Sequence, residues 1–235
     1  MANNAPLSPV TLLMTRPLAA SQRFVDEMPD DLAVRVTPVF SPLLRIEPVD
    51  HTPRLAPDAA AIFTSSNGVR YAPDGAGRTA YCVGARTTAQ ASAHGWAAQM
   101  AGQDADALVA QISGHPPDHQ LIHIRGRHTR GHIAGRLSKA GHTVTDAIVY
   151  DQVPQPLNKV AQDVLIAGDA TIVPLFSPRT AMEFVKQAPR TTCLHVIALS
   201  AAVAKAAHPL DVQSVADRPD ADAMYDAIRW AISSG

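Results

Sequence analysis

Short apolar runs rich in β-branched residues alternate along the chain with longer Ala-rich stretches in which apolar positions recur at helical spacing. The short runs favour buried strands, and the helical period favours helices that bury one face. The predicted strands are residues 10–15, 34–38, 59–64, 79–83, 121–125, 144–150, 171–176 and 194–199. The predicted helices are residues 18–28, 67–72, 87–94, 105–112, 133–140, 179–186, 201–207 and 221–232. This alternation predicts an α/β fold with doubly wound, largely parallel sheets.

The order of elements repeats in the two halves of the chain. Four segments of the first half resemble four of the second, in the same order and at a nearly constant separation. The pairs are 13–16 with 122–125, 63–66 with 175–178, 82–85 with 196–199, and 104–108 with 220–224. We interpret this as an internal duplication that builds two similar domains rather than a solenoid.

Two proline-punctuated segments, residues 34–49 and 144–156, occupy equivalent places in the halves. Proline is excluded from helix interiors and from central strands, so these segments are expected to be exposed connectors. Through them the chain would cross from one domain to the other and return.

Composition narrows the class of protein. The 235 residues are 46% hydrophobic and 17% charged, which suffices for a sizeable core. A net charge of −1 gives no general field for nucleic acid or an anionic membrane, and binding to either is not expected. Neither a secretion signal nor a bilayer-length apolar run is apparent, and Cys82 and Cys193 lie in strand-like segments typical of buried reduced thiols. We therefore expect a cytoplasmic protein.

Several predicted strands end in small or hydroxyl-bearing residues just where a helix follows. The residues are Thr15, Ser65, Ser66, Gly84, Thr87, Gly126, Thr129, Ser177 and Ser200. Capping of the helix starts would by itself explain each of them. Taken together they predict two rims of backbone donors at the carboxyl ends of parallel strands, facing each other and able to hold a ligand with many carboxylates.

Basic residues add to these rims at Arg16 and in the segment 124–130, the densest positive stretch of the chain. There Arg125 is a candidate for carboxylate binding and Gly126 permits a close backbone approach; the alternative is a solvated helix start. Histidines 115, 119 and 123 are four residues apart, but prolines interrupt any helix and no cysteine or carboxylate pattern completes a site. A metal site is not predicted.

Tyr150 is the candidate for chemistry. It ends an apolar strand and begins the return connector, so its phenol is expected to project into a cleft between the domains. A protonated phenol there would be a hydrogen-bond donor or a weak general acid. The alternative is a packing role, which is common for tyrosine at a strand end.

Taken in order, several short motifs resemble those of uroporphyrinogen-III synthases over nearly the whole chain. They are Leu12-Leu13-Met14-Thr15-Arg16-Pro17, Ile62-Phe63-Thr64-Ser65-Ser66-Asn67-Gly68-Val69, Val83-Gly84-Ala85-Arg86-Thr87-Thr88-Ala89, Ile148-Val149-Tyr150, Phe176-Ser177-Pro178 and Ile197-Ala198-Leu199-Ser200-Ala201. Each motif alone is weakly specific, whereas their order and spacing are distinctive. The last departs from the family, which often has a glycine and paired threonines where this chain has Ala198 and then Ser200-Ala201.

The resemblance implies two α/β domains joined by a two-stranded β ladder, the first from residues 1–38 and 154–235 and the second from 39–153. It implies a cofactor-free lyase of haem biosynthesis that converts hydroxymethylbilane to uroporphyrinogen III through a spiro intermediate, inverting ring D. Tyr150 stands at the family's active-site tyrosine, and Ser65, Thr87 and Ser177 at hydroxyls lining its cleft.

We also expect a monomer that receives its substrate from hydroxymethylbilane synthase. The competing hypothesis is a non-catalytic two-domain sensor of an anionic metabolite or tetrapyrrole.

Overall fold

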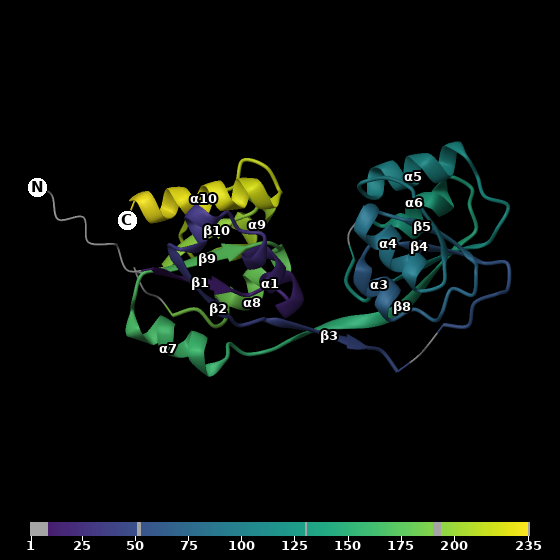
Figure 1. Ribbon diagram of the computed structural model, residues 1–235. Helices are drawn as coiled ribbons and strands as arrows, with labels where there is room; N and C mark the ends of the chain where they lie inside the picture. The colour runs from purple at the N-terminus through teal and green to yellow at the C-terminus, as the bar shows by residue number, and fades with distance from the viewer. Residues whose placement is uncertain (1–8, 51–52, 130, 190–193, 235) are drawn as a thin grey trace, which may run out of the picture. The chain divides into compact units, whose positions relative to one another are not determined.

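The computed structural model describes residues 9–50, 53–129, 131–189 and 194–234. The chain divides into two compact units (Figure 1). Unit 1 comprises Met1–Arg45 and Pro154–Gly235, and unit 2 comprises Ile46–Val153.

Unit 1 is built on a parallel sheet with the strand order β11-β10-β9-β1-β2. Its strands are β1 (Val10–Met14), β2 (Val36–Phe40), β9 (Thr171–Leu175), β10 (Leu194–Ala198) and β11 (Val212–Val215). Its helices are α1 (Leu18–Asp26), α2 (Asp30–Ala33), α7 (Lys159–Ala167), α8 (Pro178–Val185), α9 (Ala201–Ala207) and α10 (Ala221–Ser234).

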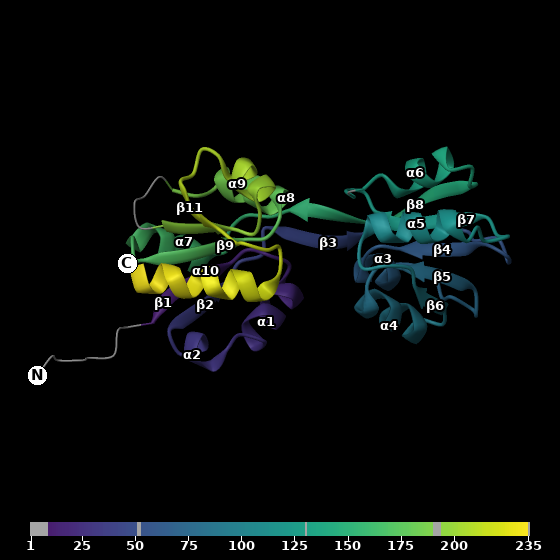
Figure 2. The same cartoon turned by 90° about the horizontal axis from the view of Figure 1, so that it is seen from above.

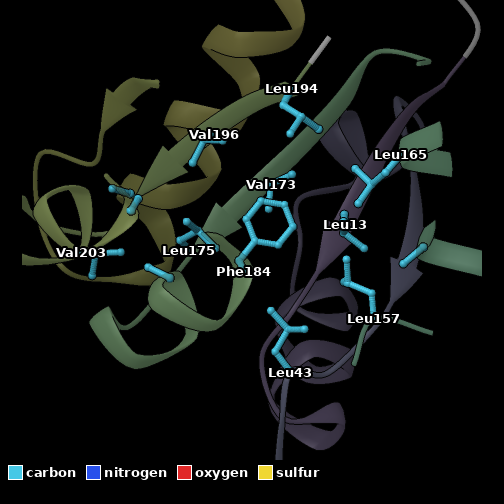
Figure 3. Packing of buried hydrophobic residues seen from close by; sticks show 14 residues of the cluster. Leu13, Leu43, Leu157, Leu165, Val173, Leu175, Phe184, Leu194, Val196 and Val203 are labelled. Atoms are coloured by element: carbon cyan, nitrogen blue, oxygen red, sulfur yellow. The ribbon is translucent and has the colours of Figure 1, made fainter. Parts of the chain in front are cut away.

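Both faces of this sheet are covered by apolar side chains. On one face α7, α8 and α9 pack over a cluster with the ring of Phe184 at its centre, beside Val173 and Leu13 (Figure 3). On the other face α1 and α10 bury Phe24 and Ile228 against Leu12. Alternation along β1 explains this arrangement, because Leu12 and Leu13 are both buried and point to opposite faces.

Unit 2 is built on a sheet with the order β3-β8-β7-β4-β5-β6. Its strands are β3 (Leu44–Pro48), β4 (Ala60–Phe63), β5 (Thr79–Cys82), β6 (Ala97–Met100), β7 (Leu121–Gly126) and β8 (Val144–Pro154). The helices α3 (Ser66–Arg70) and α4 (Ala85–Ala93) cover one face, and α5 (Ala105–Gly114) and α6 (Ile133–Lys139) cover the other (Figure 2).

In unit 2 the neighbouring strands β8, β7, β4, β5 and β6 are parallel to one another. Strand β3 is antiparallel to β8. Backbone bonds join Val49 N–H to the carbonyl of Val149 at 3.2 Å and Gln155 N–H to that of Leu43 at 3.0 Å. Residue numbers rise on one strand as they fall on the other, so the pair is antiparallel. These two strands carry the chain from unit 1 into unit 2 and back.

The two sheets have the same strand order once equivalent strands are matched. The strands β4, β5 and β6 of unit 2 correspond to β9, β10 and β11 of unit 1. In the same way β7 and β8 correspond to β1 and β2. The equivalent helices α5 and α10 also begin alike, because Asp104 and Asp220 each accept a hydrogen bond from a backbone N–H three residues later, at 2.8 and 2.9 Å. The predicted α/β fold with parallel sheets is confirmed.

Several elements were missing from the sequence-based prediction. The strands β3, β6 and β11 and the helices α2 and α7 had not been predicted, and the proline-bearing connectors are in part edge strands. Pro38 lies in β2, the edge strand of its sheet, where proline is tolerated because the outer side makes no ladder.

Cys82 is a free, buried thiol whose pKa is raised by burial to about 11, as expected for a structural cysteine, while Cys193 lies outside the described residues. No helix in the described ranges is long and apolar enough to cross a membrane.

Candidate active site

A β-bulge in β8 determines where Tyr150 points. Arg125 of β7 is opposite Ile148, but the next residue, Gly126, is opposite Tyr150, so Val149 is an extra residue on β8. Because of this extra residue the side chains of Val149 and Tyr150 both face the cluster under α3 and α4. Regular alternation would have turned one of them to the opposite face.

The phenol ring is enclosed by its own unit. Its side chain is 5% exposed, and its ring lies 6.0 Å from that of Tyr71. A Cβ added to Gly126 would be 2.5 Å from two ring carbons and 2.9 Å from the hydroxyl, so only glycine fits over this ring. The bulge therefore packs the ring within its own unit, and a hydroxyl that meets a cleft between the domains stays a prediction.

The hydroxyl end of Tyr150 meets the start of α3. Its oxygen lies 3.2 Å from Oγ of Ser65, which also accepts a hydrogen bond from the N–H of Gly68 at 3.2 Å as the helix cap. Ser65 and Ser66 are only partly buried, so the phenol hydroxyl lies at the carboxyl end of the sheet although its ring is covered. The structure thus brings together Ser65, Gly126 and Tyr150.

Arg125 is held by its neighbours. Its guanidinium makes a bidentate pair with Asp146, at 2.7 and 3.1 Å, and donates to the carbonyls of Gly126 and Arg127 at 2.9 and 3.3 Å. The side chain is 17% exposed. The Arg125 predicted to bind substrate carboxylates is paired with a carboxylate of its own chain, since Asp146 lies beside it on the adjacent strand.

His123 extends this interaction inward. Its Nδ1 lies 3.2 Å from Asp146, and its Nε2 lies 3.4 Å from the hydroxyl of Thr64. Burial lowers the pKa of His123 to about 4, although the nearby Asp146 charge opposes this. The ring is therefore neutral at pH 7, with Nδ1 donating to Asp146 and Nε2 accepting from Thr64.

The carboxyl of Asp146 stays ionised. Burial alone would raise its pKa, but hydrogen bonds and charge from Arg125, together with His123, hold it below its usual value. Two residues on, Arg127 pairs with Asp151 at 2.8 Å, and the N–H of Arg127 donates to the carbonyl of Tyr150 at 2.9 Å. The loop after β7 is thus tied to β8 on both sides of Gly126.

The remaining unit 2 candidates lie at the start of α4. Gly84 takes a positive φ of 75° there and donates its N–H to the carbonyl of Gly102 at 2.8 Å. Thr87 is 6% exposed and belongs to the buried face of the helix.

In unit 1 the predicted residues Thr15, Arg16, Ser177 and Ser200 follow the strands β1, β9 and β10. Ser177 caps α8, accepting from the N–H of Thr180 at 3.1 Å and donating to its hydroxyl at 2.9 Å. Arg16 stacks on Phe176, with its guanidinium carbon 4.1 Å from the ring centre.

Two hydroxyls differ from this pattern. Thr15 is fully buried, and its hydroxyl has no hydrogen-bond partner among the described residues. Ser200 occupies the N-cap position of α9 without a side-chain cap bond.

Sequence reasoning missed Thr64, His123 and Asp146 as a group. The only sequence signal was the alternation that places His123 and Arg125 on one face of β7. Which residues of β8 lie beside them follows from the sheet register, not from the sequence. No cluster of three or more metal-binding side chains occurs in the part of the chain that the structure describes.

A family model for uroporphyrinogen-III synthase HemD matches residues 33–226. The chain belongs to the uroporphyrinogen-III synthase family. A comparison with curated protein sequences finds no significant match.

Solved structures of uroporphyrinogen-III synthases share the fold. The Helicobacter pylori structure matches with a TM-score of 0.68 at 15% identity, covering 97% of this chain and 100% of that one. A mutant Thermus thermophilus structure matches with a TM-score of 0.51 at 15% identity, covering 96% and 100%. At these identities the likeness establishes the α/β fold.

The close contact at Gly126 gives a first prediction for this uroporphyrinogen-III synthase family member. Gly126→Ala should displace the Tyr150 ring and lower the free energy of unfolding by about 1–3 kcal/mol, the usual cost of overpacking. Gly135→Ala is the matched control, because a Cβ at Gly135 meets no atom within 4 Å and Gly135 lies within helix α6. Urea unfolding should show the control unchanged or stabilised; equal effects of both variants would contradict the contact.

The buried His123 gives a second prediction. The unfolded chain binds a proton at this histidine near pH 6.5 and the folded chain only near 4. Stability contributed by the neutral ring is therefore present above pH 6.5 and is lost as pH falls toward 4, by about 3 kcal/mol. Urea unfolding at pH 7, 5.5 and 4.5 should show a shallower acid loss for His123→Asn than for the native protein, and parallel curves would refute the assignment.

Proposed function

We propose that the chain cyclises and dehydrates hydroxymethylbilane to uroporphyrinogen III. The family match over residues 33–226 supports this activity. The observation in the structure that carries the proposal is the Tyr150 hydroxyl held 3.2 Å from Ser65 at the carboxyl end of a parallel sheet. Ligand sites of open α/β sheets lie at that end of the strands.

Tyr150 acts on the departing hydroxyl of the substrate. Phenols are protonated at neutral pH and donate hydrogen bonds. As the terminal carbon–oxygen bond breaks, hydroxide takes up a proton and leaves as water, and a methylene pyrrole with an electrophilic carbon remains. The Tyr150 hydroxyl supplies that hydrogen bond or proton and recovers a proton when the final ring loses one.

Ser65 leaves the phenol proton available to the substrate. Its oxygen already accepts from the N–H of Gly68, while its own proton is free to be donated to Tyr150. With Ser65 donating, the phenol oxygen is an acceptor on that side and directs its proton elsewhere. This orientation favours a hydrogen bond from Tyr150 to the leaving group.

The type III product requires control over which carbon attacks. Spontaneous closure joins the electrophilic carbon to the free position of ring D and gives the type I isomer. Attack from the substituted position forms a spiro intermediate, which breaks and recloses with ring D reversed. Holding the substrate in one conformation selects this route, so positioning matters more than strong acid–base groups.

Donors for the substrate carboxylates remain predictions. In unit 2 we propose Ser66 and the backbone at Gly84, which opens α4. In unit 1 the candidates are Thr15, Arg16, Ser177 and Ser200. We also propose a cytoplasmic monomer that receives the substrate from hydroxymethylbilane synthase.

The test is the identity of the product. Purified protein mixed with fresh hydroxymethylbilane should give mainly the type III isomer after oxidation and chromatography. Tyr150→Phe should lower kcat at least about 10-fold, because general acid assistance is lost. Tyr225→Phe is the control, since it removes a buried hydroxyl that donates to the carbonyl of Phe24 at 2.7 Å in unit 1.

Type I product at the spontaneous rate would overturn the proposed activity. Equal rates for Tyr150→Phe and the native protein would remove Tyr150 from the mechanism while leaving the activity in place.

A further inference from the structure

Tyr150 is held between two backbone segments that are themselves joined on the far side of the sheet. On the α3 and α4 face, Ser65 contacts the phenol oxygen and Gly126 lies over the ring. Each is preceded by a residue whose side chain turns to the opposite face, Thr64 before Ser65 and Arg125 before Gly126. Contacts that fix Thr64 and Arg125 on the opposite face therefore also fix the two segments that hold the phenol.

On that opposite face a chain of polar contacts runs from Thr64 to Arg125. Thr64 meets His123 at 3.4 Å, His123 meets Asp146 at 3.2 Å, and Asp146 forms the bidentate pair with Arg125. His123, in the middle of this connection, is 1% exposed, whereas the side chain of Asp146 is 37% exposed. We define these four residues as the relay.

We propose that the relay positions the phenol of Tyr150 for the reaction by fixing the two backbone segments that hold it. This inference rests on the proposed function for its catalytic consequence. Its members are positioning residues, because each acts through Tyr150, and this role replaces direct substrate binding for Arg125.

The Arg125 end of the relay acts directly on the backbone. The guanidinium donates to the carbonyls of Gly126 and Arg127, at 2.9 and 3.3 Å, and so fixes the peptide that lies on the phenol ring. Asp146 fixes the guanidinium in turn, because its two oxygens match the Nε and Nη2 donors. Loss of the Asp146 charge frees Arg125 and with it the Gly126 peptide.

The Thr64 end fixes the other contact. The hydroxyl of Thr64 ties the end of β4 to β7 through His123, and the next residue, Ser65, contacts the phenol oxygen. A movement of Thr64 shifts Ser65 relative to Tyr150, and a movement of Arg125 shifts Gly126. Displacements of this kind, about 1 Å, are enough to slow a positioned reaction up to about 100-fold.

The experiment is a double-mutant cycle between the relay and the phenol. Asp146→Asn keeps the shape of the side chain and removes its charge; kcat should fall about 10-fold and the type III fraction should fall with it, while KM stays within about twofold. In a Tyr150→Phe background the same change should alter kcat by less than about twofold, because the group it positions is absent.

A matched control comes from unit 1, where Asp31 forms a similar bidentate pair with Arg229 at 3.0 and 3.3 Å. Asp31→Asn should leave kcat and the isomer ratio as in the native protein. Thr64→Val, which replaces the terminal hydroxyl of the relay by a methyl group, should show the Asp146→Asn pattern with a smaller loss and serves if Asp146→Asn does not fold. Native kcat in both relay variants, or a full loss that persists in the Tyr150→Phe background, would overturn the inference.

A readout without turnover separates this inference from the proposed function. The chain has 4 tyrosines, so isotope-labelled tyrosine gives a small set of ring signals. Asp146→Asn should shift the Tyr150 signal and leave that of Tyr225 unchanged. If the native protein makes type III product but the Tyr150 signal does not move, the relay fails and the function stands; if the signal moves but no type III product forms, the function fails and the relay stands.

Discussion

Strand β8 contains one residue, Val149, that has no partner on β7. It lies between Ile148 and Tyr150, which is the partner of Gly126, and the position of the phenol depends on it. The bulge directs Val149 and Tyr150 into the same cluster. The ring is then enclosed, while its hydroxyl reaches the helix cap at Ser65. Bulges of this kind turn a side chain without breaking the sheet, because the ladder resumes at the next residue. Here it resumes at the 2.9 Å bond from Arg127 to Tyr150.

The internal duplication shows how one framework serves two purposes. Ser65 and Ser177 occupy equivalent places, each capping the helix that follows a buried strand. In unit 1 the second partner of the cap is the hydroxyl of Thr180, three residues away. In unit 2 it is the phenol of Tyr150, from a strand two positions across the sheet. The same local motif therefore caps a helix in both units, and in unit 2 it also contacts the phenol that is proposed to act on the substrate.

Much of the fold was readable from the sequence because apolar periodicity and burial coincide. The α/β class and the duplication came from strong patterns such as the runs before Thr15 and Thr64. The strand β6 was missed because its four residues are mostly exposed and show no alternation. The helix α7 was missed although it has clear punctuation, with Asn158 capping its start and Gly168 at a positive φ of 76° after its end.

The candidate site was only partly predictable. Tyr150 and Ser65 stood out as a strand end and a helix start, but their contact depends on a bulge that has no sequence signature. Arg125 was taken for a ligand-binding residue because sequence does not show that Asp146 lies beside it across the ladder. In the sequence His123 was considered only as a metal ligand. Its contact with the carboxylate of Asp146 depends on the register between β7 and β8, which the sequence does not show.

The central claim is that the ring of Tyr150 lies against the backbone of Gly126 before any substrate is bound. A nuclear Overhauser measurement on the ligand-free protein tests it most directly. Strong cross-relaxation between the Tyr150 ring protons next to the hydroxyl and the α-protons of Gly126 is the predicted result. The absence of those cross-peaks, with the ring protons instead exchanging magnetisation with water, would contradict the account.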